Sequence, residues 1–190
     1  MLSAVDEAGC GPLAGPVVAA AVQTSGPLRI PGVADSKRLH PGLRASLAEE
    51  ITRQVDAWAV GVASVEEIDT LNIRKAAALA MGRAVEALPQ APDLVLVDGP
   101  WPIPIPFPQR TVVNGDAQVA LVAAASILAK VERDRIMVEL DRLYPGYGFA
   151  RHKGYPTREH LLALARLGPS PVHRLSFAPF RTGPDPRSFR

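Results

Sequence analysis

Apolar runs along the chain predict a small set of strands placed ahead of, and between, longer helices. Two strands are expected near the start, over Leu2–Ala8 and Pro16–Gln23, because small and β-branched apolar residues fill both segments. The run Asp93–Gly99 contains the continuously apolar segment Leu94–Val97, which is typical of a strand buried on both faces. Two further strands are expected over 56–64 and 109–113.

Helices are predicted where apolar residues recur every three or four positions. Pro41 opens a helix to Gln54, with Leu43, Leu47 and Ile51 on one face. The other expected helices start at Ser64, run from Leu71 to Leu88, run from an Asp116 cap to Leu143, and run from Thr157 to Leu167. Loops are expected over 24–36, 100–108 and 144–155, and a frayed end over 182–190. Strands with helices around them indicate a mixed α/β layer fold.

The length and charge distribution suggest one domain with a basic extension. A chain of 190 residues can bury a full core. We expect a main domain over 1–143 and an extension over 144–190. The extension has eight Lys/Arg against two Asp/Glu, whereas the rest has 13 against 17. An acidic body with a basic end is typical of a metal-dependent enzyme acting on a polyanion, although a solvated basic tail has the same composition.

Other features of the sequence point to a cytoplasmic protein with no membrane partner. The apolar run Pro12–Val22 is too short to span a bilayer, and the first residues lack a basic region and an apolar signal core. A single cysteine excludes an internal disulfide and fits a reducing compartment. We expect a cytoplasmic monomer.

Two neighbouring carboxylates, Asp6 and Glu7, end the first predicted strand and are followed by Gly9, Gly11 and Gly15. Adjacent side chains on a strand point to opposite faces, so both acids can serve one site only if the backbone departs from regular geometry there. Glycines allow that departure and let a ligand approach the backbone. The stretch predicts a place where metal and phosphate meet, and solvated turn residues are the alternative.

A dinucleotide-binding loop is a second alternative for the same glycines, but the sequence argues against it. Such a loop leads into a helix, whereas Pro12 and Pro16 interrupt this one and Val17 and Val18 favour a strand. Two carboxylates would also repel a pyrophosphate.

Two more acids stand where the predicted elements can bring them to the same edge. Asp98 ends a central strand, and Asp116 follows shortly after it. If the strands that end at Asp6 and Asp98 are neighbours, four carboxylates converge and raise one another's pKa unless cations intervene. Ligand sets made only of oxygen select Mg²⁺ or Mn²⁺, and two such ions can clamp a phosphodiester. Separately, Asp98 could be a turn former and Asp116 a helix cap.

The motifs, taken in order, resemble type 2 ribonuclease H (ribonuclease HII) from about Val5 to Phe180. They are Asp6-Glu7-Ala8-Gly9-x-Gly11, Asp35-Ser36-Lys37, Val97-Asp98-Gly99, Gly115-Asp116, Ala124 to Lys130 with Arg133-Asp134, Tyr147-Gly148-Phe149 with His152-Lys153-Gly154-Tyr155, and His173-Arg174 with Ser176-Phe177. The resemblance implies a ribonuclease-H-like mixed sheet flanked by helices, with a C-terminal helical extension. It also implies Mn²⁺- or Mg²⁺-dependent cutting of RNA in RNA/DNA hybrids and 5′ of ribonucleotides embedded in DNA, giving 5′-phosphate and 3′-hydroxyl ends.

The resemblance also assigns roles to residues of this chain. It makes Asp6, Glu7, Asp98 and Asp116 the metal-holding acids of a two-metal mechanism. The backbone of Gly9, Cys10 and Gly11 corresponds to the loop that reads the ribose 2′-hydroxyl. Tyr155 corresponds to the tyrosine that stacks on the deoxyribose after the ribonucleotide, the alternative being a partly buried loop aromatic.

The cysteine in the glycine loop departs from the family pattern, which usually has Gly-Arg-Gly where this chain has Gly9-Cys10-Gly11. Backbone recognition of the 2′-hydroxyl should survive, but a guanidinium contact to phosphate is lost, so weaker substrate binding is expected. Cys10 is not expected to be a nucleophile, because no base or cation adjoins it in sequence and the two carboxylates oppose the thiolate.

Basic residues complete the predicted site. Arg151, Lys153 and Arg174, together with His152, form an expected strip that binds the nucleic-acid backbone, and Lys37 is either a phosphate contact or a solvated loop residue. Lys130 and Asp134 are four apart, so a helical ion pair is expected. The four histidines are too scattered for a zinc site.

Two other classes of function stay open at this point. One is a nucleic-acid-binding domain of the same fold that has lost catalysis, which the four acids argue against. The other is a nucleotide-cofactor oxidoreductase, which would bind NAD tightly.

Overall fold

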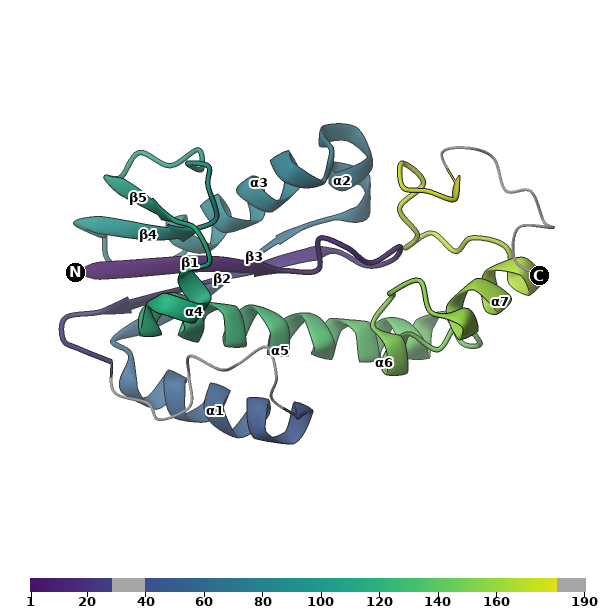
Figure 1. Ribbon diagram of the computed structural model, residues 1–190, viewed down its shortest axis with the longest axis horizontal. Helices are drawn as coiled ribbons and strands as arrows, with labels where there is room; N and C mark the ends of the chain where they lie inside the picture. Colours follow the sequence, from purple (N-terminus) through teal and green to yellow (C-terminus); the bar gives the residue numbers. More distant parts are fainter. Residues whose placement is uncertain (29–39, 181–190) are drawn as a thin grey trace.

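The computed structural model describes residues 1–28 and 40–180, and within them a five-stranded mixed sheet lies between two helical layers (Figure 1). Its strand order is β3-β2-β1-β4-β5. The strands are β1 (Leu2–Ala8), β2 (Val17–Thr24), β3 (Ala57–Ala63), β4 (Leu94–Asp98) and β5 (Gln109–Val112). Neighbouring pairs among β1, β2 and β3 are antiparallel, whereas β1–β4 and β4–β5 are parallel. The predicted mixed α/β fold is therefore confirmed.

The helices are divided between the two faces of the sheet. Their bounds are α1 (Pro41–Gln54), α2 (Val65–Leu71), α3 (Ile73–Glu86), α4 (Gly115–Gln118), α5 (Ala120–Leu143), α6 (Phe149–His152) and α7 (Arg158–Leu167). Helices α1 and α5 cover one face and α2 and α3 the other, while α6 and α7 extend beyond the end of the sheet (Figure 1). In the part of the chain that is described, no helix is both long and apolar enough to cross a membrane.

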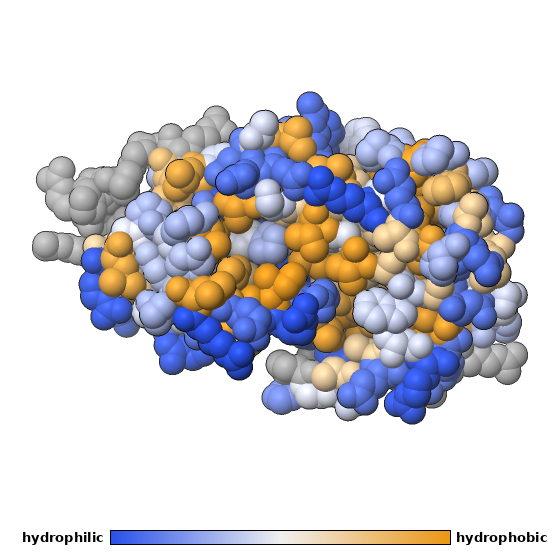
Figure 2. Space-filling model, turned by 180° about the vertical axis from the view of Figure 1, so that it is seen from behind, coloured by the Kyte–Doolittle hydropathy of each residue, from blue (hydrophilic) through white to orange (hydrophobic). Residues whose placement is uncertain are grey.

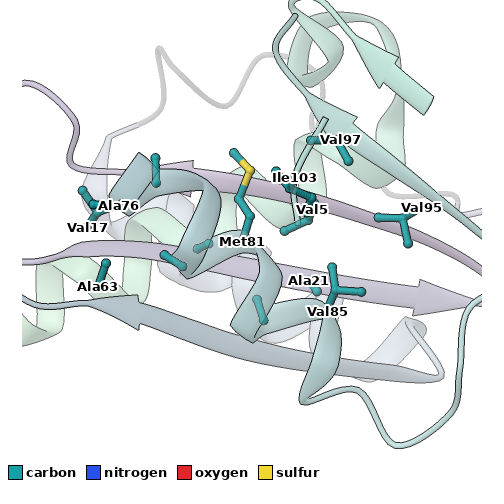
Figure 3. Close-up of a cluster of buried hydrophobic side chains, with 14 of the residues drawn as sticks. Val5, Val17, Ala21, Ala63, Ala76, Met81, Val85, Val95, Val97 and Ile103 are labelled. Atoms are coloured by element: carbon teal, nitrogen blue, oxygen red, sulfur yellow. The ribbon is translucent and has the colours of Figure 1, made fainter. Parts of the chain in front are cut away.

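Each face of the sheet has its own apolar core. On the face toward α3, side chains of β1, β2 and β4 such as Val5, Ala21 and Val97 pack against Met81 and Val85 (Figure 3). Close approach of α3 to β3 requires Gly61, because a Cβ there would lie 2.0 Å from the carbonyl oxygen of Ala80. The central strands β1 and β2 are thus covered, and the ends of the strands are where polar side chains can reach solvent.

On the opposite face, small residues of α5 let this long helix lie close against the sheet. Ala4, Ala20 and Val22 of the sheet pack there with Ala124 and Leu128 of α5. This packing explains why an alanine-rich helix of 24 residues is stable here despite its weak apolar stripe.

A third apolar cluster attaches the C-terminal part to the body. Leu13 and Met137 pack there with Phe149 and Leu164, and the Ala14–His173 bridge adds a backbone contact. The Thr157 side chain accepts a hydrogen bond from the His160 amide, so α7 begins where predicted. Figure 2 shows apolar residues gathered in the middle of one face, with hydrophilic side chains along its borders.

Two helix starts differ from the sequence prediction. Asn72 takes a positive φ of 75° and accepts a hydrogen bond from the Lys75 amide, so α3 starts at Ile73, separate from α2. Asp116 does not cap the long helix. It lies in the single turn α4, and α5 begins only after Val119, whose backbone is extended. The break before α3 is possible because asparagine adopts a positive φ more readily than most other residues.

Candidate active site

The carboxylate edge, formed by Asp6, Glu7 and Asp98, lies where the parallel strands β1 and β4 end. The pairing of Val5 with Val97 makes Asp6 and Asp98 neighbours across the two strands. Alternation turns both toward the α5 side of the sheet, whereas Glu7 turns toward the α3 side. The expected irregularity between Asp6 and Glu7 is absent, since β1 pairs regularly with β2 as far as Ala8. Asp6 and Glu7 therefore point to opposite faces of the sheet and come together only at the end of β1.

Helix α4 brings the fourth predicted acid to this region. The Gly115 amide donates a hydrogen bond of 2.7 Å to Asp98 Oδ1, which fixes the start of α4 against the end of β4. Asp116, the next residue, is buried with 3% of its surface exposed. The structure thus places Asp116 next in the chain to the amide that bonds Asp98, while the meeting of all four carboxylates stays a prediction.

Burial and mutual repulsion act on the carboxylates together. The pKa of Asp6 is raised well above its ordinary value, first by burial and then by the charges of Glu7 and Asp98, while the Ser126 hydroxyl opposes this. The pKa of Glu7 is also raised, mainly by burial, with the Cys10 thiol opposing and Asp98 adding to the rise. Ionising this edge is unfavourable in the protein alone, and an added cation would reverse that.

The donor set fits hard divalent ions. All the candidate ligands are carboxylate oxygens, which suit Mg²⁺ and Mn²⁺. Within residues 1–28 and 40–180, no three His, Cys, Asp or Glu side chains are grouped closely enough to hold one ion by themselves. Mg²⁺ is commonly bound through one or two carboxylates plus water and substrate phosphate, so the edge fits ions that arrive with, or are completed by, the substrate.

Two buried arginines, Arg174 and Arg133, support the glycine loop (Gly9–Gly15) by hydrogen bonds to backbone carbonyls. Arg174 donates to the carbonyl oxygens of Gly9 (2.7 Å), Cys10 (3.2 Å) and Gly15 (2.9 Å). Arg133 donates to the carbonyls of Ala14, Pro16 and Lys153, at 3.1 Å each. Both guanidinium groups are fully buried.

The path of the loop depends on this support. Gly9 has a φ of 100°, and a Cβ there would lie 2.0 Å from Arg133 Nε. Burial, and then the charge of Arg133, lowers the pKa of Arg174 to about 9. The expectation that Arg174 belongs to a surface strip is therefore corrected, because its guanidinium is buried against loop carbonyls. Sequence reasoning missed the matching role of Arg133.

Cys10, within the glycine loop, lies beside the carboxylate edge. Its thiol donates to Glu7 Oε1 at 3.5 Å. Burial, followed by the charge and hydrogen bond of Glu7, raises the pKa of the thiol to about 12. A thiol with this pKa is protonated at neutral pH, which agrees with the prediction that Cys10 is not a nucleophile.

Tyr155 lies beside the glycine loop in a hollow of about 260 Å³, the Tyr155 hollow, which also contains Glu7, Gly9, Arg44 and Lys130. The tyrosine is 45% exposed, so its ring is available to a ligand.

The remaining predicted basic residues are placed as follows. Arg151 is exposed and forms an ion pair with Glu159, and the Lys153 ammonium contacts the carbonyl of Ala150. Lys130 and Asp134 form the predicted helical ion pair at 2.5 Å. Lys37, with its Asp35-Ser36-Lys37 motif, lies outside the described residues.

Arg44, which sequence reasoning missed, lines the Tyr155 hollow and a second hollow that continues toward Arg151 and Lys153. The side chain forms an ion pair with Asp134, with 3.6 Å between the charged atoms. On a predicted amphipathic helix it looked like an ordinary solvated position, so no local signal marks it.

The sheet order, the parallel β1–β4 pair and the acids at its end define a nuclease of the ribonuclease H type. Comparison with known proteins gives the particular family. The family model for ribonuclease HII matches residues 4–180. A ribonuclease HII of Caulobacter vibrioides (strain NA1000 / CB15N) is 57% identical over 178 residues, covering 93% of this chain and 84% of that one.

Solved structures agree with this assignment. The ribonuclease H2 of Pyrococcus horikoshii OT3 is 28% identical, with a TM-score of 0.78 and coverage of 100% of this chain and 98% of that one. The ribonuclease HII of Archaeoglobus fulgidus, solved as a complex with PCNA, is 31% identical, with a TM-score of 0.76 and coverage of 98% and 97%. The chain belongs to the ribonuclease HII family, whose members are metal-dependent ribonucleases H that cleave RNA in RNA/DNA hybrids.

Proposed function

We propose that this ribonuclease H also cuts on the 5′ side of single ribonucleotides embedded in duplex DNA, and that every cut leaves a 5′-phosphate and a 3′-hydroxyl. The observation that carries the proposal is the strand register that makes Asp6 and Asp98 neighbours at the end of β1, directly before the glycine loop. A site that joins metal-binding acids to a backbone able to inspect a sugar can select a single ribonucleotide.

Asp6, Glu7, Asp98 and Asp116 hold two divalent ions, Mn²⁺ or Mg²⁺. When bound, such ions activate the attacking water and neutralise the charge that develops on the phosphate. The raised pKa values of Asp6 and Glu7 support this role, because these carboxyls gain most from a nearby cation. Metal and substrate phosphate are expected to bind together.

Substrate selection belongs to the other side of the site. The backbone of Gly9, Cys10 and Gly11 inspects the 2′-hydroxyl, and Tyr155 packs against the deoxyribose that follows. The rigid support from Arg174 favours this role, since a loop that discriminates by one hydroxyl must be held in place.

The basic extension over 144–190 makes the contacts to the nucleic-acid backbone. Arg151 and Lys153 contact phosphates there, and Lys37 is a further phosphate contact. The protein acts as a cytoplasmic monomer. Light scattering of the purified chain in solution tests the oligomeric state.

The test is cleavage of a labelled DNA duplex that carries one ribonucleotide. Mn²⁺ or Mg²⁺ should give one cut 5′ of the ribonucleotide, with end groups identified by phosphatase and ligase treatment, and chelator should abolish it. A long RNA/DNA hybrid in a parallel tube separates the general activity from the finer one.

Matched controls complete the experiment. An all-DNA duplex should stay intact, and Glu86→Gln, an exposed acid at the end of α3, should keep wild-type activity. Cutting of the hybrid alone would refute the action on embedded ribonucleotides. Binding without any cut would favour the inert nucleic-acid-binding module.

A further inference from the structure

A second and larger cavity, the Trp101 cavity, opens on the carboxylate edge from the side opposite Tyr155. Its volume is about 610 Å³, and Glu7 and Asp98 form part of its wall. The rest comes from Cys10, from α3 between Ile73 and Met81, and from the loop between β4 and β5. The wall is mostly apolar, including Met81 and Ile103, but Arg74 and Lys75 add two exposed cations at the start of α3.

Trp101 stands at this cavity as an exposed and well-supported aromatic. It is 60% exposed, and the Arg74 guanidinium carbon lies 5.4 Å from the centre of its ring. Pro100 and Pro102 flank it and restrict the backbone on both sides. The loop is closed by the Gln109 side chain, which bonds both the amide and the carbonyl of Ile103, at 2.8 and 2.9 Å.

This combination matches the chemistry of a polynucleotide strand. An exposed ring offers a flat apolar surface to a sugar or a base, and neighbouring cations attract the phosphates on either side. Two cations beside an apolar wall would not suit a neutral apolar ligand, and the acids that line the cavity would repel a small free anion. A strand whose cut phosphate is held at those acids satisfies both conditions.

The direction of the strand follows from the two hollows. Glu7 lines both the Tyr155 hollow and the Trp101 cavity, so a strand crossing the carboxylate edge passes from one to the other. The proposed function places the nucleotide after the ribonucleotide against Tyr155. The Trp101 cavity is then on the 5′ side of the cut.

We propose that Trp101, Arg74 and Lys75 form a subsite for the strand segment on the 5′ side of the cut, with the indole against a sugar and the two cations at the adjacent phosphates. This inference rests on the proposed function for its strand direction. The subsite holds the segment that receives the 3′-hydroxyl, and so contributes to substrate affinity and to retention of the nicked product.

The test measures binding to fluorescent duplexes with one ribonucleotide by anisotropy, with Ca²⁺ in place of Mn²⁺ as the ion for the carboxylate edge and a gel to check that the strand stays uncut. Neutral methylphosphonates replace single phosphates, one at a time, along the cut strand and along its complement. Wild-type affinity should fall for one or two positions on the 5′ side of the cut. In Arg74→Ala and Lys75→Ala these same positions should lose their effect, because the cation that senses them is gone.

Trp101→Ala should weaken binding about tenfold, and Trp101→Phe should restore most of it. Two variants serve as matched controls and should bind like the wild type. Trp58→Ala removes an exposed tryptophan that lies on the edge strand β3, away from this cavity, and Arg53→Ala removes a cation at the end of α1.

Three results would overturn the subsite: wild-type affinity in Trp101→Ala, the same phosphate effects in the Arg74 and Lys75 variants, or sensitive phosphates confined to the complementary strand. Failure of the proposed function gives a different pattern, in which wild-type protein with Mn²⁺ leaves the unmodified ribonucleotide duplex uncut.

Discussion

The carboxylate edge and the glycine loop place charges in similarly buried surroundings, but the charges differ in where their hydrogen bonds go. Arg174 donates to four backbone carbonyls and Arg133 to three, so their cost of burial is offset within the protein. Glu7 accepts a weak bond from the Cys10 thiol and is repelled by Asp98. Burial alone therefore does not mark a functional charge.

The comparison separates a structural cation from an anion kept for chemistry. Charges satisfied by fixed backbone atoms hold a loop in place, and removing one damages the fold. Charges that repel each other at a strand end are destabilising until a ligand arrives, as expected at a catalytic site. Each prediction below tests one side of this difference.

The largest effect is expected for Asp6→Asn. Loss of an ion-holding carboxylate should lower kcat by about 10²–10³-fold or more, comparable to the loss of a key electrostatic contact in other enzymes. In chelator the same variant should be more stable than the wild type at pH 7, because the raised pKa of Asp6 means that its ionised form is disfavoured in the fold. Cleavage assays and urea unfolding measure the two.

The sign of the stability effect follows from proton binding. A carboxyl whose pKa is raised on folding binds protons in the folded state at pH values where the unfolded chain has lost them. Stability falls as the pH rises through that range, and asparagine removes the loss. A variant that is inactive and also less stable in chelator would contradict the distinction between the two regions.

Arg174→Met should have the opposite profile, with a large effect on stability. The buried carbonyls of Gly9, Cys10 and Gly15 lose their donor, and each orphaned group costs about 1–3 kcal/mol, so a loss of several kcal/mol is expected. Thermal unfolding measures it. Arg166→Met, an exposed arginine near the end of α7, is the control and should change little. Unchanged stability in Arg174→Met would show that the loop is held by other contacts.

How far the sequence predicts these two regions differs for a physical reason. Asp6 and Asp98 were predictable because apolar runs mark β1 and β4, and acids at the ends of neighbouring strands must meet. The support of Arg133 and Arg174 was not, because most of their partners are backbone carbonyls more than a hundred residues away, which no side-chain pattern reveals. Charged residues are seldom buried, so Arg174 was assigned to the surface.

The same reasoning explains the errors in the helices. No glycine or proline separates Asp116 from α5, so the sequence gives no sign that Val119 is extended and that Asp116 belongs to a separate turn. Trp101 and Arg74 were also missed, since a tryptophan in a proline-rich loop has no period to interpret. Packing between distant segments decides such positions.

Cys10→Arg should sharpen the comparison by adding a cation beside the carboxylate edge. The residue faces Glu7 and the Trp101 cavity, so a guanidinium there can reach substrate phosphate. Binding to a hybrid at moderate salt should tighten by about 1.5–3 kcal/mol, the value of a charge-assisted hydrogen bond. Anisotropy titrations at two salt concentrations measure this. Cys10→Ser, which adds no charge, should bind like the wild type, and unchanged affinity in Cys10→Arg would contradict the expected phosphate contact.

The smallest effect concerns two buried histidines, His160 and His173, which are linked by hydrogen bonds to the Tyr155 carbonyl. They belong to neither of the two regions compared above, because both rings are neutral. The Ser170 amide donates to His173 Nδ1 at 2.9 Å, so in the neutral ring Nε2 carries the proton. That proton faces His160 Nε2 at 3.0 Å, and His160 Nδ1 then donates to the Tyr155 carbonyl at 2.9 Å. Adding a proton to either ring puts two donors face to face and weakens the support of Tyr155.

Stability should therefore fall on acidification. Burial, followed by the charge of His160, lowers the pKa of His173 to about 4, and burial lowers that of His160. Between about pH 6.5, where an unfolded histidine titrates, and about pH 4, the unfolded chain binds more protons, so the stabilisation present above pH 6.5 is lost as the pH falls. The slope is at most about 1.4 kcal/mol per pH unit for each histidine.

Urea unfolding in chelator from pH 7 to 5 measures this slope. The measurement is made in an Asp6→Asn background, because the carboxylate edge has the opposite pH dependence. The double variant His160→Gln/His173→Gln should have a flatter dependence of stability on pH than the control His40→Gln, whose histidine lies at the start of α1. Equal slopes in these two variants would show that His160 and His173 titrate in the folded protein as they do in the unfolded chain.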